Sequence, residues 1–259
     1  RTERTVISRG LWIAFLAITL TPSYAQTTVS FCGNPVQKPY NSSPQFFAPD
    51  GTRGVGIRIW INGVLSPVPD TKAACLPIAL RYNNPGVLKT PSKGSWPNQT
   101  SKDSKGHAVF PTVEAGITAW GLWMKKKSES GKPQTAMSIM SVYAPPNDCV
   151  GSIGTPPNCP YGINPTAEYA ARVAANVNKK PEDVLNLDGT DCKEGRDALY
   201  ALFQQIASFE IGGNFCGREN NKTLALCDVD RELFDKAMDT AYGPVNFGKC
   251  ADPAEAHEK

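Results

Sequence analysis

The sequence has 259 residues, of which 41% are hydrophobic, and a formal charge of +3 at neutral pH. This length allows one large domain, or a domain with an extension, and a sizeable buried core. Once a predicted leader of 25 residues is set aside, 24 basic groups face 23 acidic groups. Because positive and negative charges are nearly equal in number, the mature chain lacks the excess of basic residues that is typical of a nucleic-acid-binding protein.

The first 25 residues have the pattern of a secretory signal peptide. Three arginines precede an apolar run at residues 11–20, and small residues at Ser23 and Ala25 predict cleavage after Ala25. The run has about ten residues, which is too short for the roughly 20 that a membrane-spanning helix needs. We therefore expect a secreted or periplasmic protein with no membrane segment after cleavage.

Eight cysteines follow the predicted cleavage site, and an even number in an exported chain indicates disulfide bonds. Two pairs would each close a short loop rich in turn residues, although spacing alone does not fix the connectivity. The predicted bonds are Cys149 with Cys159 and Cys216 with Cys227, and then Cys32 with Cys75 and Cys192 with Cys250. Zinc would need closely spaced Cys/His pairs, which the sequence lacks. We expect no metal and no other cofactor.

Residues 26–75 are expected to form an extended lead-in followed by a small N-terminal β-hairpin. The lead-in, to about residue 50, is rich in Pro, Ser, Asn and Gln and poor in aliphatic residues. Residues 56–61 alternate apolar and polar side chains and close on Asn62-Gly63, the strongest short hairpin signal. The hairpin is either part of the core or an accessory flap.

Residues 76–250 are predicted to form a helical domain, so the expected fold class is mainly α (α+β). The helices are predicted from apolar residues at spacings of three and four, and their boundaries from capping residues and helix breakers. Thr112 is the expected N-cap of the first long helix. Helices are predicted at residues 112–127, 135–142, 166–177, 194–210 and 228–240, with a short one after Pro181. The polar residues 251–259 are expected to be a frayed tail.

A turn is predicted where Pro-Gly follows Asn84, because proline presets φ and glycine accepts positive φ. The side chains of Arg81, Tyr82, Asn83 and Asn84 combine a guanidinium, an aromatic face and two amides. Amides bond hydroxyls in both directions and arginine forks onto carboxylates, so these four are candidate substrate-binding residues. The alternative, equally open, is a self-satisfied turn that holds two helices.

Residues 90–107 form a predicted long loop, and loops of this length are usually functional or disordered. Trp96 lies on this loop and is the fifth candidate binding residue, because its ring could stack on a sugar face. His107 is one of two histidines, and no nucleophile motif accompanies it. We expect His107 to be a surface or loop-packing residue.

Two carboxylates are candidates for catalysis of glycoside hydrolysis, which needs a raised-pKa acid and a second carboxylate or a held water. Glu210 ends an apolar helix face, where burial would raise its pKa, so it is the candidate acid. Asp148, in an exposed turn, is the candidate second carboxylate. The alternative for Glu210 is a structural glutamate beside a helix C-cap, and the alternative for Asp148 is an aspartate that forms an Asx turn. Glu114 is explained as a first-turn partner of the helix dipole.

The Glu-Ile-Gly-Gly-Asn segment that starts at Glu210 is similar to the Glu-Ser-Gly-Gly-Asn around the catalytic acid of lytic transglycosylases. The Gly-Leu-Met-Gln element that follows in those enzymes is absent from this chain.

Three motifs together resemble a family of small phage and bacterial proteins that open with Arg-Asn-Asn-Asn-Pro-Gly. They are the Arg-Tyr-Asn-Asn-Pro-Gly block, the Phe110 helix motif with Glu-x-Gly-Ile, and the Tyr-Ala-Pro-Pro-Asn-Asp turn that ends at Asp148. The resemblance covers roughly residues 78–212. Family members are described as virion structural proteins and are sometimes suspected of acting on cell wall.

Export, disulfides and this resemblance predict a secreted protein that engages peptidoglycan or a related glycan. A lysozyme-like glycan hydrolase is the expected activity if the protein is an enzyme. The alternatives are a non-catalytic, virion-like structural or binding module and an exported effector that acts on a protein partner.

Overall fold

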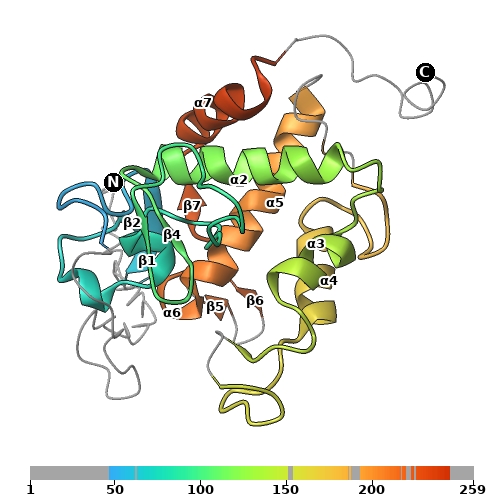
Figure 1. The fold of residues 1–259 in the computed structure, drawn as a ribbon, viewed down its shortest axis with the longest axis horizontal. Coiled ribbons are helices and arrows are strands. Elements are labelled where there is room, and N and C mark those ends of the chain that lie inside the picture. The colour runs from blue at the N-terminus through green and yellow to red at the C-terminus, as the bar shows by residue number, and fades with distance from the viewer. Residues whose placement is uncertain are drawn as a thin grey trace, which may run out of the picture.

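The protein is seen in a computed structural model that describes residues 47–61, 63–150, 154–185, 187, 193–216, 218–219, 223–224 and 226–245. These residues form a mixed α+β fold rich in helix (Figure 1), which confirms the predicted class at that level. The predicted leader, nearly all of the lead-in and the tail lie outside the described residues. Among the described helices, none is long and apolar enough to cross a membrane.

A three-stranded antiparallel sheet joins the beginning and the end of the described chain. β1 (Ile57–Ile61) pairs with β2 (Val64–Pro67) on one edge and with β7 (Asp228–Val229) on the other. The predicted hairpin is not confirmed as a separate unit, because β7 occupies the second edge of β1. Ile57 and Ile59 are buried in the core, so the sheet is no accessory flap.

Seven α-helices and two further strand pairs are described. The helices are α1 (Ile78–Arg81), α2 (Val113–Ser128), α3 (Ala136–Tyr143), α4 (Thr166–Ala175), α5 (Lys193–Ile211), α6 (Gly213–Cys216) and α7 (Arg231–Tyr242), with the 3-10 turn η2 (Ala73–Cys75) before them. The strand pairs are β3 (Ser101–Lys102) with β4 (Ala108–Val109), and β5 (Arg218–Glu219) with β6 (Thr223–Leu224).

Side-chain caps start α2 and α3, close to the predicted boundaries. The Thr112 hydroxyl accepts a hydrogen bond from the Ala115 amide at 3.2 Å, as expected of an N-cap. Thr135 and Ser138 form a reciprocal capping box at the start of α3. These short-range signals can be read from sequence, which is why the two starts were predicted correctly.

Two predicted helix positions were wrong. The helix expected after Pro181 is a turn, because the backbone of this segment is used elsewhere: the Pro181 carbonyl accepts from the Met137 amide at 2.9 Å. The last helix was expected from about residue 228. It begins at Arg231 instead, because Asp228 and Val229 form β7 and Asp230 caps the helix.

The long helix α5 is the centre of the core. It lies behind α2, with α7 along α2 and with α3 and α4 beside the lower part of α5 (Figure 1). Phe203 of α5 packs on Trp120 of α2 at a ring distance of 4.7 Å and on Phe234 of α7 at 5.5 Å. Arg196 of α5 is buried and donates a hydrogen bond to Asp239, which fixes α7.

The disulfide bonds Cys149–Cys159 and Cys216–Cys227 are both present, so these two predictions are confirmed. Cys75 is also disulfide-bonded. Disulfide bonds are typical of an oxidising, extracellular compartment. The remaining cysteines lie outside the described residues, so the bonds of Cys32 with Cys75 and of Cys192 with Cys250 stay predictions.

Candidate functional site

The two turn asparagines are buried and their amides are used inside the protein. The Asn83 side chain accepts from the Gly54 amide at 2.8 Å and donates to the Pro111 carbonyl at 3.0 Å. The Asn84 side chain accepts from the Leu88 amide at 2.9 Å and donates to the Leu88 carbonyl at 2.9 Å. Both residues are 0% exposed, so the assignment of Asn83 and Asn84 to substrate binding was wrong.

The other two candidates in this block are buried as well. The guanidinium of Arg81 lies over the rings of Phe47 and Tyr82, and the residue is 3% exposed. Tyr82 is 0% exposed, and its hydroxyl donates to Asp103 at 3.4 Å. The assignments of Arg81 and Tyr82 to binding are therefore also wrong. The block forms the self-satisfied turn that was the alternative.

Trp96 is the only one of the five predicted binding residues that keeps exposed surface. Its indole N–H donates to the Lys89 carbonyl at 2.9 Å, and its ring packs partly on the core. No interaction in the described part of the chain connects Trp96 with Glu210.

His107 is buried in a network under the long loop. Its ring nitrogen Nδ1 lies 2.9 Å from a carboxylate oxygen of Asp103. Burial alone would raise the pKa of Asp103, but the hydrogen bonds from His107 outweigh it and lower that pKa. The predicted loop-packing role of His107 fits this geometry, and the surface role does not.

Glu210 is a partly desolvated carboxyl group near the C-terminal end of the long helix. It lies in the last turn of α5, and the residue is half-buried. Desolvation raises its pKa to about 7, because the charged form loses hydration. No described residue donates a hydrogen bond to the carboxyl group.

Two tyrosines on neighbouring helices lie close enough to feel the charge of Glu210. Burial, and then the charge of Glu210, raise the pKa values of Tyr143 at the end of α3 and Tyr169 on α4. Tyr169 stacks on Phe209 with ring centroids 4.8 Å apart, and both residues are half-buried. Trp123 meets Tyr143 edge-on at 5.1 Å. Aromatic residues of α3, α4 and α5 therefore lie in the region of Glu210, and Trp123 of α2 packs on one of them.

The turn packs closely on Trp120 and Tyr143 at Gly86. A Cβ at Gly86 would stand 2.7 Å from Cδ1 of Trp120 and 3.2 Å from the hydroxyl oxygen of Tyr143. Gly86 thus connects the predicted turn with the surroundings of Glu210, through packing rather than through binding side chains.

Sequence reasoning missed Tyr143, Tyr169 and Phe209 as site residues. Tyr143 belongs to the Tyr-Ala-Pro-Pro-Asn-Asp motif, but the sequence assigns no role to the tyrosine of that motif. Tyr169 carries no local signal, because its position relative to Glu210 depends on how α4 packs on α5. Phe209 directly precedes Glu210 on α5, and its place in the apolar end of that helix is the signal that could have found it.

Asp148 lies on the turn that follows α3. Its carboxylate accepts from the amide of Cys149 at 2.7 Å, and its backbone carbonyl accepts from the Asn164 amide at 3.0 Å. The Cys149–Cys159 bond anchors the turn. Within the described ranges, no interaction joins Asp148 to Glu210, so the structure does not pair the two predicted catalytic carboxylates.

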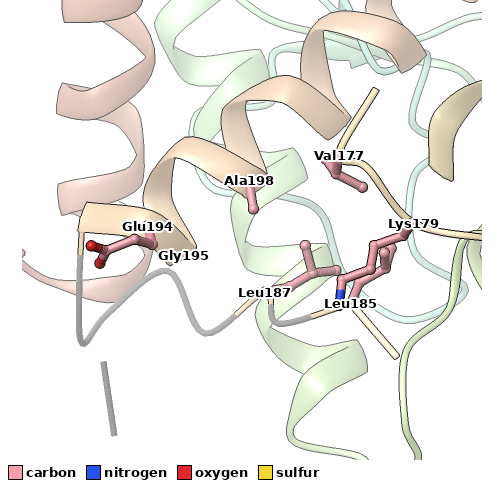
Figure 2. A pocket seen from close by; sticks show the side chains of 7 residues that line it. All are labelled: Val177, Lys179, Leu185, Leu187, Glu194, Gly195 and Ala198. Atoms are coloured by element: carbon pink, nitrogen blue, oxygen red, sulfur yellow. The ribbon is translucent and has the colours of Figure 1, made fainter. Parts of the chain in front are cut away.

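A separate pocket of about 190 Å³ lies near the other end of α5 (Figure 2). Its apolar walls come from Val177, Leu185, Leu187 and Ala198, while Lys179 and Glu194 stand on opposite sides. Glu194 and Glu210 are at the two ends of the same helix, roughly 24 Å apart at 1.5 Å per residue. The pocket is therefore not the surroundings of Glu210.

No protein-family model matches the chain, and no curated protein is significantly similar to it. The described residues also hold no cluster of three or more potential metal ligands.

Proposed function

We propose that this protein is secreted and hydrolyses peptidoglycan or a related glycan, with Glu210 as the general acid. The observation that carries the proposal is the Glu210 carboxyl group in the last turn of α5, whose pKa desolvation raises to about 7. A catalytic acid works best when its pKa is near the operating pH, because it is then protonated and still able to give up the proton.

The chemistry needs one proton transfer at the start. Glu210 gives its proton to the glycosidic oxygen as the bond from that oxygen to the anomeric carbon breaks, and the bonding electron pair stays on the leaving oxygen. Water then supplies a hydroxyl group to the anomeric carbon, and its remaining proton restores the neutral Glu210 carboxyl.

The half-buried pair of Tyr169 and Phe209 is the proposed sugar platform. Both rings lie beside Glu210, and aromatic faces suit the apolar face of a sugar ring. The pair takes the binding role that the buried turn residues were expected to have. Trp96 remains a candidate for a more distant sugar.

Asp148 keeps its proposed role as the second carboxylate, which orients water or stabilises positive charge. Two features support this role: Asp148 lies on the turn directly after the helix that carries Tyr143, and a disulfide bond holds that turn. Replacement of Asp148 by asparagine tests the role separately from Glu210.

The decisive experiment is incubation of the oxidised chain of residues 26–259 with purified peptidoglycan, followed by mass spectrometry of the soluble fragments. Glu210→Gln should reduce fragment release by about a hundredfold or more, because the proton donor is lost. The matched control is Glu129→Gln, which changes an exposed glutamate at the end of α2 and should release fragments at the wild-type rate.

Full activity of Glu210→Gln would remove Glu210 from the mechanism. Pelleting of the protein with the wall and no fragment release would instead favour the non-catalytic binding module. Neither release nor pelleting would point to a protein partner.

A further inference from the structure

The pocket near the start of α5 has no role in the proposed hydrolysis, because it lies at the opposite end of that helix from Glu210 (Figure 2). Its volume is about 190 Å³. An apolar cavity of about 150 Å³ binds benzene, so the space is large enough for an apolar group of about six carbon atoms.

Small residues of α5 form one wall of the pocket. Gly195 and Ala198 lie three residues apart, which places them on the same face of the helix. A larger side chain at Ala198 would extend into the space that this wall leaves open. The pocket therefore follows from the choice of small residues in the first turns of α5.

Backbone hydrogen bonds hold the other walls. The Leu185 amide donates to the Gln134 carbonyl at 2.8 Å, which ties this segment to the chain just before α3. At the end of α4, Asn178 has a left-handed φ of 55°, and the Lys179 amide donates to the Ala174 carbonyl at 2.9 Å. This is the pattern of a helix C-cap, so the backbone at Lys179 is fixed.

The pocket combines apolar walls with a cationic group at its edge. Leu185 and Leu187 are 6% and 4% exposed, whereas Lys179 is exposed to solvent. Figure 2 shows the Lys179 side chain extending towards the two leucines, while the carboxylate of Glu194 points away from them. Binding sites of this kind hold an apolar group by burial and orient it by a charged one.

We propose that this pocket binds a small organic carboxylate with an apolar chain of about five or six carbon atoms. The chain packs against Leu185 and Leu187, and the carboxylate pairs with the Lys179 ammonium at the edge. The inference is independent of the proposed hydrolysis. Glu210→Gln should therefore bind such a ligand as the wild type does, whatever its effect on fragment release.

The test is a titration of the oxidised protein with hexanoate, followed by ¹H–¹⁵N NMR. The amide signals of Leu185 and Leu187 should shift and saturate with a Kd on the order of 1 mM, as expected of a ligand with so few atoms. Ala198→Leu should weaken binding at least about tenfold, because the leucine fills the pocket. Ala171→Leu, at an exposed alanine of α4 outside the pocket, should bind as the wild type does.

The charge of Lys179 is tested separately. Lys179→Gln should weaken hexanoate binding about threefold to fivefold, which is the effect of a solvent-exposed ion pair. Lys180→Gln removes the same charge from a neighbouring exposed lysine that does not line the pocket, so it should have no effect. Hexan-1-ol, which lacks the carboxylate, should bind the wild type as weakly as hexanoate binds Lys179→Gln.

Hexanoate binding that fails to saturate by about 10 mM, or that Ala198→Leu leaves unchanged, would refute the site. Equal affinity of the wild type for hexanoate and hexan-1-ol would refute the anionic class of ligand. Tighter binding of 6-aminohexanoate than of hexanoate would also refute that class, and would assign a zwitterion that Glu194 recognises as well.

Discussion

The backbone carbonyl of Asn83 occupies the place where any side chain on Gly116 would begin. A Cβ on Gly116 would stand 2.0 Å from the Asn83 oxygen, closer than any real contact of this kind. The turn that contains Asn83 is therefore seated directly on helix α2, and both elements are fixed by the same contact.

Gly116→Ala should destabilise the protein by about 3 kcal/mol, because backbone on both sides of the contact must move. Thermal and denaturant unfolding of the oxidised protein would measure the loss. Gly121→Ala is the comparison on the same helix, where a Cβ meets the end of the Met238 side chain at 2.5 Å and the Cβ of Ala241 at 3.0 Å. That change should cost clearly less than Gly116→Ala, because side chains rather than backbone must move and alanine gains about 1 kcal/mol of helix propensity. Equal losses in both variants would contradict this account.

Asn84→Ala should cost about 2 to 4 kcal/mol of unfolding free energy, because buried groups of Leu88 and Ala108 lose their partners. Below its lowered melting temperature the variant should retain whatever glycan binding and cleavage the wild type has, since Asn84 is fully buried and bonded within the protein. Asn147→Ala, at an exposed asparagine, should change stability by less than about 0.5 kcal/mol. Loss of glycan binding by folded Asn84→Ala would restore Asn84 to the binding site.

Glu210 should make stability fall as pH rises. Its pKa is about 7 in the folded chain against an ordinary 4.5, so the folded state holds the proton more tightly than the unfolded state. The contribution is fully present below about pH 4.5 and is lost as pH rises through about 7, with a total of about 1 to 3 kcal/mol. Denaturant unfolding across this range should show the slope in the wild type and not in Glu210→Gln. Parallel curves would mean that the carboxyl group is not desolvated.

Gly86→Ala should lower stability by about 2 kcal/mol and fragment release by more than the stability loss explains. The added methyl group meets the buried ring of Trp120, which is held against Phe203, and it presses on the Tyr143 hydroxyl. The loss of stability and the loss of activity can be separated by measuring fragment release at a temperature where all variants are folded. Normal release by folded Gly86→Ala would show that the position of Tyr143 does not matter for activity.

Local signals in the sequence predicted most of the long helices, whereas contacts between distant segments could not be predicted from it. Thr112 and Thr135 cap helices through bonds to residues three positions away, so short motifs reveal them. The strand at Asp228 could not be foreseen, because it forms only by pairing with Ile57 and Arg58. The same limit placed the start of α7 three residues too early.

The desolvation of Glu210 was predicted from the sequence, whereas the residues near it were missed. Glu210 was found because an apolar helix face predicts burial of the glutamate that ends it. The polar turn was misread, because a sequence cannot show whether an amide faces solvent or a neighbouring carbonyl. Asn83 and Asn84 face carbonyls, and the glycine two positions after Asn84 is the residue of the turn that reaches the surroundings of Glu210.

The pairing of β1 with β7 gives this protein a high contact order. The second edge of β1 (Ile57–Ile61) pairs with a strand at Asp228, about 170 residues later in the sequence. Because the chain is synthesised from its N-terminus, the early strand can pair with β2 but keeps its second edge open until the end of the chain follows. The sheet, and with it the seat of α7 directly after β7, is therefore completed only when the last part of the chain is available.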